Sequence, residues 1–289
     1  MENNNSLGIS ESRPGYGLND DLYTPEVGSW AETKYRLVRM YNELFSTGMK
    51  KLWHKRVYID LFAGAGKARI RKSNKTVLAS PLLALNVPDK YDRYIFCDED
   101  QRNIEALKAR VAKEYSNIDV KFIVGDCNEK IEDILALIPR PSSTNRVLSF
   151  CFVDPFSLNI EFETIKKLSQ YLMDFLILLA LSMDANRNES IYVDENNLRI
   201  DKFLGITDWR PRWEMARQIN QSFRKFLALE YANQMANLRY KKDSLRTMIE
   251  MRSEDNNLPL YHLAFYSRDP KGYQFWKEVR KYAIEPTLF

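Results

Sequence analysis

Short apolar segments alternate with amphipathic segments from position 56 to position 181. The segments "VYIDLFA", "RYIFCDED", "VKFIVGD", "VLSFCFVDPF" and "DFLILLAL" have the length and composition of buried strands. Between them lie segments with helical spacing, such as "QRNIEALKARVAKEY", "NEKIEDILALI" and "IEFETIKKLSQYL". Because repeated β–α units form parallel sheets covered by helices, the pattern predicts a Rossmann-like, doubly wound α/β fold with a mostly parallel sheet.

Further elements flank this core. Leu37, Met40, Tyr41, Leu44 and Phe45 share one helical face and predict an N-terminal helix. The segments "LRTMIEMR" and "LYHLAFYS" predict two more strands, which we expect to be an antiparallel addition. We therefore expect a mobile tail over 1–28, a cofactor-binding core over 29–185, a helical insertion or cap over 186–240, and C-terminal strands completing the sheet over 241–289.

Composition limits the class of protein. The chain has 289 residues and is 45% hydrophobic, which supports a large folded core and excludes disorder. No apolar run reaches the length of a transmembrane helix, and the polar N-terminus lacks the apolar core of a signal peptide, so we expect a cytoplasmic protein without a membrane segment. Residues 201–289 hold 16 Lys and Arg against 11 Asp and Glu, which permits an anionic partner without requiring one.

Polar residues follow four of the predicted strands at their carboxyl ends. The first strand leads into "AGAG" with Gly64 and Gly66, and the next three end near Asp98, Asp126 and Asp154. In open parallel sheets, ligands bind outside the carboxyl ends of the strands. An acid after the second strand suits the hydroxyls of a ribose, and Asp126 could accept from an adenine amino group.

The glycine segment argues against a phosphate-rich cofactor. "GAGKAR" lacks the third glycine of a dinucleotide fingerprint, and no helix follows it directly to receive a pyrophosphate. The GxxxxGK[ST] pattern of nucleotide hydrolases is also absent. S-adenosylmethionine, a nucleoside that carries an amino acid, fits best. The predicted cofactor-binding residues are Asp60, Phe62, Ala63, Gly64, Gly66, Asp98, Glu99, Asp126 and Cys127.

The residues after the glycines predict a mobile loop over 67–79 near the cofactor. This stretch is rich in Lys, Arg, Ser, Asn and Thr. A helix is expected after it, with Ser80 as N-cap and Pro81 at the first helical position.

A short motif suggests the reaction. "DPF" at Asp154, Pro155 and Phe156 distantly resembles the DPPY motif of methyltransferases that act on amino groups of nucleobases. In that chemistry a carboxylate accepts from the amine and an aromatic ring stacks on the base. The alternative is a strand that ends in a proline turn, with Phe156 packing under the insertion.

Two other groups of residues have open interpretations. Arg187, Arg210, Arg212 and Trp213 could form a nucleic-acid-binding surface, or Trp209 and Trp213 could be buried behind a solvated helix. Cys97, Cys127 and Cys151 show no CxxC spacing, so we expect structural roles rather than a metal or redox site. With only His54 and His262 in the chain, a histidine-rich metal site is excluded, and we predict no metal ligands.

Several segments together resemble one family. "YIDLFAGAG", "SPLLAL", "FCDED" and "FVDPF" resemble the class I methyltransferase-like three-Cys-motif partner proteins (TcmP), and so do "WAETKYRLVRMY", "DKFLGITDW" and "YHLAFYSRDPKGYQFWKEV". The resemblance implies an S-adenosylmethionine fold and a partner, a radical-SAM-like protein, that bears the three-cysteine motif. Two departures are "AGAG" without the usual proline and Trp276 in place of a smaller residue. A non-catalytic scaffold subunit of the same fold is the alternative function.

Overall fold

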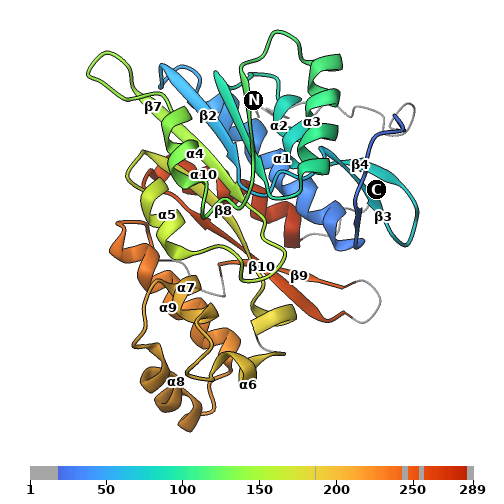
Figure 1. Cartoon of the computed structure of the whole chain (residues 1–289). Helices are drawn as coiled ribbons and strands as arrows, with labels where there is room; N and C mark the ends of the chain where they lie inside the picture. The colour runs from blue at the N-terminus through green and yellow to red at the C-terminus, as the bar shows by residue number, and fades with distance from the viewer. Residues whose placement is uncertain (1–18, 186, 243–246, 254–256, 285–289) are drawn as a thin grey trace, which may run out of the picture.

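The centre of the molecule is a seven-stranded sheet with the order β6-β5-β2-β7-β8-β10-β9 (Figure 1). The computed structural model describes residues 19–185, 187–242, 247–253 and 257–284. Strands β6, β5, β2, β7 and β8 run parallel, whereas β10 runs antiparallel to both β8 and β9. The strands are β2 (Lys55–Asp60), β5 (Arg93–Asp98), β6 (Val120–Val124), β7 (Val147–Val153), β8 (Met173–Leu179), β9 (Ile249–Arg252) and β10 (Pro259–Tyr266).

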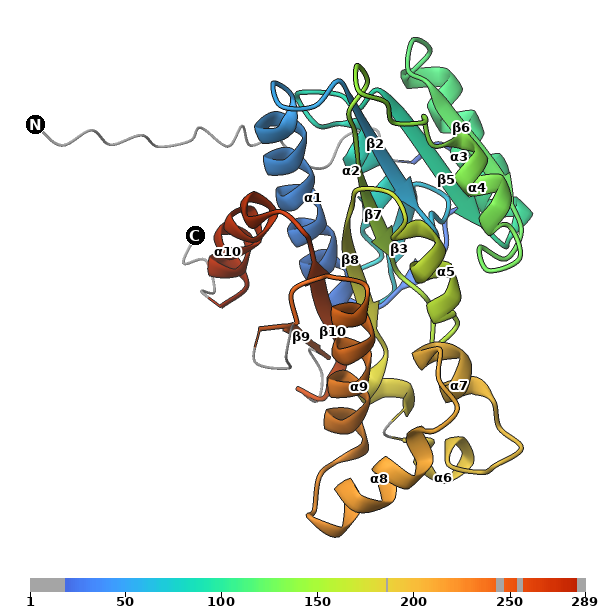
Figure 2. The ribbon, with the colours of Figure 1, turned by 90° about the vertical axis from the view of Figure 1, so that its left-hand side faces the viewer.

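Helices cover both faces of this sheet (Figure 2). One face carries α1 (Trp30–Met49), α2 (Ser80–Leu85) and α10 (Pro270–Ile284), and α1 contacts both of the others. The other face carries α3 (Gln101–Glu114), α4 (Ile131–Leu137) and α5 (Phe162–Leu168). Every residue of β7 and β8 is buried, as expected for central strands covered on both sides. The predicted doubly wound, mostly parallel α/β fold is confirmed.

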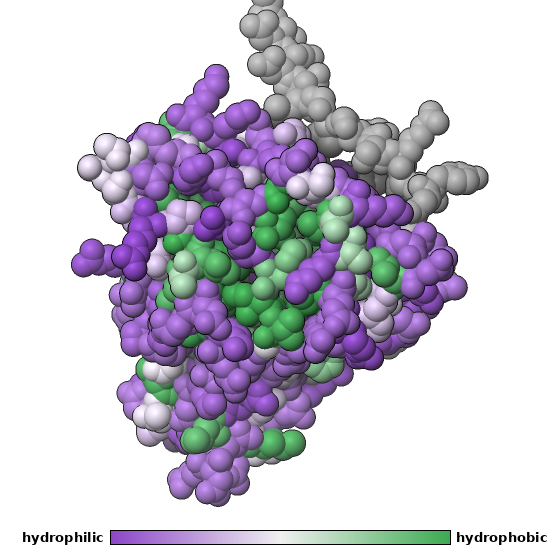
Figure 3. Space-filling model, turned by 45° about the horizontal axis from the view of Figure 1, so that its top comes forward, coloured by the Kyte–Doolittle hydropathy of each residue, from purple (hydrophilic) through white to green (hydrophobic). Residues whose placement is uncertain are grey.

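The edge of the sheet at β6 is less covered than its centre. Four of the five residues of β6 are only partly buried or are exposed. Figure 3 looks onto the α3 and α4 side with the top of the molecule tilted forward, and apolar residues gather at the centre of this face inside a hydrophilic rim.

Among the described residues, none of the helices combines the length and the apolar character that a membrane span requires.

The segment after β8 is helical, as the sequence predicts. A π-helical turn (Leu181–Ala185) leads into α6 (Glu189–Tyr192), α7 (Arg199–Leu204), α8 (Trp209–Gln218) and α9 (Phe223–Asn237). These helices extend below the sheet in Figures 1 and 2. Trp209 and Trp213 are buried here against Phe223 and Phe226.

Two expectations about irregular segments need correction. Residues 1–18 of the expected mobile tail lie outside the described residues, but 19–28 pack on the core, and β1 (Glu26–Val27) pairs with β3 (Lys67–Ile70). The expected loop over 67–79 is instead a β-hairpin of β3 and β4 (Thr76–Leu78). Asn74 closes the turn with a φ of 56°, a left-handed conformation that Asn tolerates, so "KARI" and "TVL" can pair.

Candidate functional site

The glycine segment forms a tight loop at the carboxyl end of β2. Gly64 and Gly66 have φ values of 63° and 84°, which L side chains rarely adopt. A Cβ on Gly66 would lie 2.7 Å from Leu107 Cδ1, so this glycine allows α3 to approach the loop. A Cβ on Gly64 would have no described atom within 4 Å, because Gly64 faces an open cavity.

Asp98, at the end of β5, holds this loop in place. Its Oδ2 accepts a hydrogen bond from the Gly64 backbone N–H at 2.7 Å. Its Oδ1 accepts from the Asp100 backbone N–H at 3.0 Å and from Asn103 Nδ2 at 2.9 Å. Most of the acceptor capacity of this carboxylate is therefore used inside the protein. The next residue, Glu99, is exposed and lines the space above the rim.

Two cavities meet at Phe62 and Glu99. The first, of about 560 Å³, lies between the rim and the insertion. The second, of about 400 Å³, lies between the glycine loop and α1. The first is lined by Phe62, Glu99, Asp126 and Cys127 among others, and the second by Phe62, Ala63, Gly64, Asp98, Glu99, Asp154, Pro155 and Phe156 among others. The structure thus brings together every predicted site residue except Asp60 and Gly66, which support the loop from below.

Asp60 is a buried acid beneath the second cavity. Its side chain accepts from the Tyr58 hydroxyl at 3.2 Å and from the Phe62 backbone N–H at 3.3 Å. Burial raises the pKa of Asp60 to about 7, and the nearby Asp154 carboxylate adds to this. Ser80 also bonds to Asp60 and makes no capping bond to its helix, so the expected N-cap role of Ser80 is wrong, and Ala79 is the N-cap.

Asp154 forms an ion pair with Lys34 of α1. Both side chains are largely buried, and the Lys34 Nζ also lies 4.7 Å and 4.6 Å from the ring centroids of Trp30 and Tyr35. Burial lowers the pKa of Lys34, but the adjacent Asp154 carboxylate, together with Tyr35 and Tyr261, outweighs burial and holds that pKa above its usual range. Lys34 therefore neutralises the predicted catalytic acid.

Aromatic rings surround this ion pair. The ring of Trp30 lies 4.6 Å from that of Tyr261 on β10, and Tyr35 lines the same cavity. Phe156 is 80% exposed at the mouth, so it does not pack under the insertion. Trp30, Tyr35 and Tyr261 were not predicted as site residues, because α1 and β10 lie far apart in the chain.

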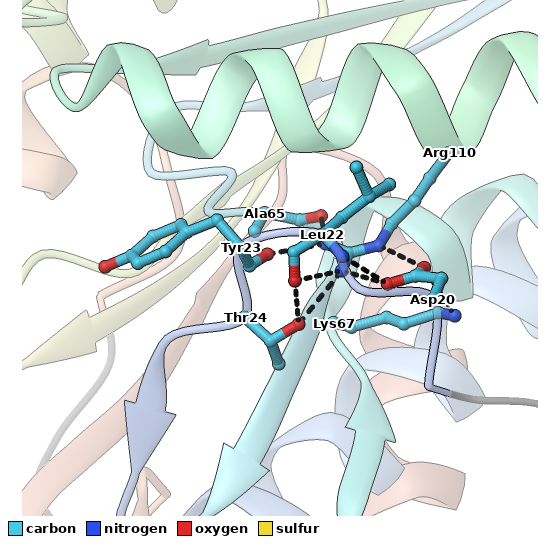
Figure 4. Close-up of polar contacts among 7 residues, drawn as sticks. All are labelled: Asp20, Leu22, Tyr23, Thr24, Ala65, Lys67 and Arg110. Atoms are coloured by element: carbon cyan, nitrogen blue, oxygen red, sulfur yellow. Dashed lines mark hydrogen bonds and ion pairs between the residues drawn. The ribbon is translucent and has the colours of Figure 1, made fainter.

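Residues 19–28, which we call the N-terminal strap, cross the outside of the glycine loop (Figure 4). Arg110 of α3 is only 2% exposed and donates two hydrogen bonds of 2.8 Å to Asp20. The same guanidinium donates to the Ala65 carbonyl of the glycine loop at 2.6 Å. Lys67 donates to Asp20 at 2.8 Å. One arginine therefore fixes the strap and the loop to the same helix.

The strap also forms part of the wall of the site. Pro25 and Val27 line the second cavity, and Arg110 makes further bonds to Tyr23, Thr24 and Leu22. Hydrogen bonds from Arg110 and Lys67 outweigh burial and lower the pKa of Asp20 well below its usual range. Asp20 and Arg110 stand far apart in the sequence, and no local pattern signals their contact.

Three of the four residues considered for a nucleic-acid surface are engaged within the insertion, whereas Arg187 is exposed. Arg210 pairs with Asp201, and Arg212 pairs with Asp208 and Glu230. Trp213 is buried, as in the structural interpretation of this segment. Arg210, Arg212 and the rings of Trp209 and Trp213 are therefore used for packing within the insertion.

The three cysteines are free and buried. Burial raises the pKa of Cys97 to about 12 and raises that of Cys127 and Cys151 above the usual range of a thiol. Cys127 nevertheless lines the first cavity, where it offers an apolar contact surface.

The residues present fit S-adenosylmethionine. Asn103 lines the second cavity, and its Oδ1 is buried without a hydrogen-bond partner among the described residues. Such an acceptor suits the ammonium end of an amino acid. The exposed Glu99 lies where the two cavities meet and suits a ribose diol, while Asp126 and Cys127 at the far side suit an adenine.

Comparison with known proteins shows that the fold of this chain is similar to those of several solved structures. No family model matches the sequence, and no curated protein matches it. The chain is similar to protein LPL1258 from Legionella pneumophila, with 11% identity and a TM-score of 0.49 over 87% of this chain and 90% of that one. It is similar to Trm1 from Pyrococcus horikoshii in complex with S-adenosyl-L-methionine, with 12% identity and a TM-score of 0.42 over 84% and 58% of the two chains.

A third similar structure is the geranyl diphosphate C-methyltransferase of Streptomyces coelicolor, with 10% identity and a TM-score of 0.38 over 78% of each chain. At these values, the fold assignment rests on the strand order and directions and not on the similarities. The sheet, with antiparallel β10 between β8 and β9, is of the class I methyltransferase type. The resemblance to three-Cys-motif partner proteins stays a prediction.

Proposed function

We propose that the chain is an S-adenosylmethionine-dependent methyltransferase that acts on a nucleobase-type amine, in a nucleic acid. The observation that carries this proposal is the junction of two cavities at Phe62 and Glu99, one suited to a nucleoside and the other lined by Asp154 and aromatic rings. When bound, the cofactor would supply an electrophilic methyl group. The chain's own residues would bind it, orient the acceptor and exclude water.

In this proposal, Glu99 takes the role that the sequence alone assigned to Asp98. Glu99 would accept hydrogen bonds from the ribose hydroxyls, because Asp98 already accepts three from the protein. Asp126 would accept from the adenine amino group beside Cys127, and Asn103 Oδ1 would accept from the amino-acid end. Asp98 and Gly66 would keep the loop open for the ligand.

The acceptor would enter beside Phe156 and lie among the rings of Trp30, Tyr35 and Tyr261. Flat aromatic walls suit a planar base, since stacking needs only a π-face. Asp154 would accept from the amine while the ion pair with Lys34 holds that carboxylate in position. Methyl transfer needs proximity and in-line orientation more than acid–base groups, so a site without histidine suffices.

A second candidate function is a non-catalytic scaffold of the same fold. The ion pair between Lys34 and Asp154 favours it, because a paired carboxylate has less capacity left for an acceptor amine. The resemblance to three-Cys-motif partner proteins fits both candidates, with the radical-SAM-like protein as the proposed partner.

Transfer of tritium from labelled cofactor to nucleic acid, with and without the three-cysteine partner, separates the two functions. We expect the wild type to transfer label, and Asp154→Ala to lose turnover while keeping its affinity for the cofactor. If wild type and Asp154→Ala transfer label equally, the proposed role of Asp154 is wrong. If the wild type binds cofactor but labels no acceptor with or without the partner, the scaffold function replaces the enzyme.

A further inference from the structure

A third cavity, distinct from the two at the cofactor rim, lies at the opposite end of the sheet. It has a volume of about 530 Å³ and lies between the end of α9 and the start of α10. Tyr266 at the end of β10 pairs with Phe175 near the start of β8, so this hollow adjoins the amino ends of the parallel strands. We call it the α9–α10 pocket, and its lining residues are Arg239, Tyr240, Lys241, Ser267, Arg268, Pro270 and Tyr273.

The α9–α10 pocket carries three positive charges without an acid among its described lining residues. Arg239, Lys241 and Arg268 are all exposed, and within the described ranges no carboxylate forms an ion pair with any of them. The neighbouring Asp269 accepts from the Lys271 backbone N–H at 2.8 Å at the start of α10. Three cations lining one hollow repel one another, and an anion bound between them would relieve that repulsion.

Arginines of α8 in the insertion, in contrast to those of the α9–α10 pocket, form ion pairs within the fold. Arg210 and Arg212 of α8 each meet carboxylates within 3.2 Å, so cations there are neutralised inside the fold. The α9–α10 pocket differs from α8, because none of its three cations forms an ion pair with a carboxylate of the described residues.

Arg268 is held in a fixed orientation that leaves two donors for a ligand. Its Nε and Nη2 donate to the Leu238 carbonyl at 3.2 Å and 2.8 Å, and its Nη1 donates to the Tyr171 carbonyl at 3.4 Å. The guanidinium also lies 4.3 Å from the ring centroid of Tyr240. An arginine has five N–H donors, so these bonds leave one on each terminal nitrogen.

A planar fork with one N–H on each terminal nitrogen matches two oxygens of a phosphate. Lys241 adds a second positioned charge, because its Nζ lies 5.1 Å from the ring centroid of Tyr273. The start of α10, a helix of 15 residues, adds the positive end of its dipole at Pro270. A phosphate carries up to two negative charges and so matches the three cations better than a single carboxylate does.

We infer that the α9–α10 pocket is a phosphate-binding site, separate from the cofactor rim. Its ligand is a phosphate group, which either free phosphate or the backbone of a nucleic acid can supply. The site stands independently of methyl transfer, because none of its residues lines either cavity at the rim.

Calorimetric titrations of the full chain, without cofactor, test this inference. The probes are inorganic phosphate and a single-stranded oligonucleotide. We expect the wild type to bind at least one of them, and Arg268→Gln and Lys241→Gln to weaken that binding at least tenfold. Arg268→Lys should also weaken it, since lysine keeps the charge but loses the fork. Lys51→Gln, which removes an exposed positive charge elsewhere, should bind as wild type does.

The two probes identify the source of the phosphate. Binding of the oligonucleotide that the Arg268→Gln and Lys241→Gln variants weaken assigns the site to a nucleic-acid backbone, and binding of inorganic phosphate alone assigns it to free phosphate. An unchanged melting temperature of the variants ensures that they are folded. The inference is overturned if the wild type binds neither probe, or if the Arg268 and Lys241 variants bind as tightly as the Lys51 variant.

Discussion

Two neighbouring acids at the end of β5 have different tasks. Asp98 is buried and bonds to the glycine loop, whereas Glu99 is exposed where the two cavities meet. The sequence could place both at the rim, because a strand end and a parallel sheet determine that much. It could not say which carboxylate is left over for a ligand, because that depends on the donors that fold around each one.

The first prediction separates these two roles. Glu99→Gln should weaken S-adenosylmethionine binding by about 1.5–3 kcal/mol, the effect of losing hydrogen bonds to a charged group, without changing stability. Asp98→Asn should weaken binding and also lower the free energy of unfolding, because it disturbs the bonds that hold Gly64. Calorimetry and urea denaturation measure both effects. Normal affinity in Glu99→Gln would show that the ribose role belongs elsewhere.

The second prediction concerns the ion pair under the acceptor cavity. Lys34→Met should lower the free energy of unfolding by about 3–5 kcal/mol, because it leaves the largely buried Asp154 without a partner. The double variant Lys34→Met/Asp154→Asn should lose less than the sum of the two single variants. Urea denaturation of the three variants gives the coupling free energy. Additive losses would mean that the pair does not interact as described.

At the scale of elements, the strap is the feature that reaches furthest across the chain. It joins residues 19–28 to α3, to β3 and to the glycine loop through Arg110 and Lys67. Local patterns predicted the strands and helices of the core well, since the spacing of apolar residues within each segment indicates which face is buried. They missed the strap and the hairpin over 67–79, because short, polar strands are stabilised by partners elsewhere and not by their own composition.

The third prediction tests the strap. Asp20→Asn should release it, because the buried Arg110 then loses the charge that compensates it. The backbone N–H groups of Arg69 and Arg71, which donate to Pro25 and Val27 of the strap, should exchange hydrogen faster. Cofactor affinity should fall as well, since the strap lines the cavity. The matched control is Asp21→Asn, at an exposed neighbour, and equal exchange in both variants would refute the role of Asp20.

At the scale of the whole molecule, buried acids make stability depend on pH. Burial raises the pKa of both Asp60 and Asp174 to about 7 from an ordinary value of 3.8. Between these values the folded chain holds protons that the unfolded chain releases, so each acid lowers stability as the pH rises from about 4 to about 7. His262 has the opposite effect, because burial lowers its pKa to about 4 from an ordinary value of 6.5. Between these pH values it raises stability as the pH rises.

The fourth prediction isolates the contribution of Asp60. The free energy of unfolding of the wild type should fall relative to that of Asp60→Asn by about 1.4 kcal/mol per pH unit across this range, the slope for one proton. Above pH 7 and below pH 4, the difference in free energy of unfolding between the wild type and Asp60→Asn should stay constant. Urea denaturation at a series of pH values measures it. Parallel curves from pH 4 to pH 7 would contradict a raised pKa for Asp60.

The sequence predicted the architecture of the molecule better than the assembly of its site. Strand spacing was enough for the doubly wound sheet, and the rim followed from parallel strands. The acceptor cavity takes Lys34 from α1, Asp154 from the end of β7 and Tyr261 from β10, three elements whose packing no local pattern encodes. The pairing of Lys34 with Asp154 therefore came only with the structure.

Titration of the purified chain with S-adenosylmethionine by calorimetry tests whether the rim of the sheet binds this cofactor. We expect saturable binding at one site per chain, at least tenfold weaker in Glu99→Gln and unchanged in Arg268→Gln, whose substitution lies at the opposite end of the sheet. Absence of binding by the wild type at millimolar concentrations of S-adenosylmethionine and of S-adenosylhomocysteine would contradict it.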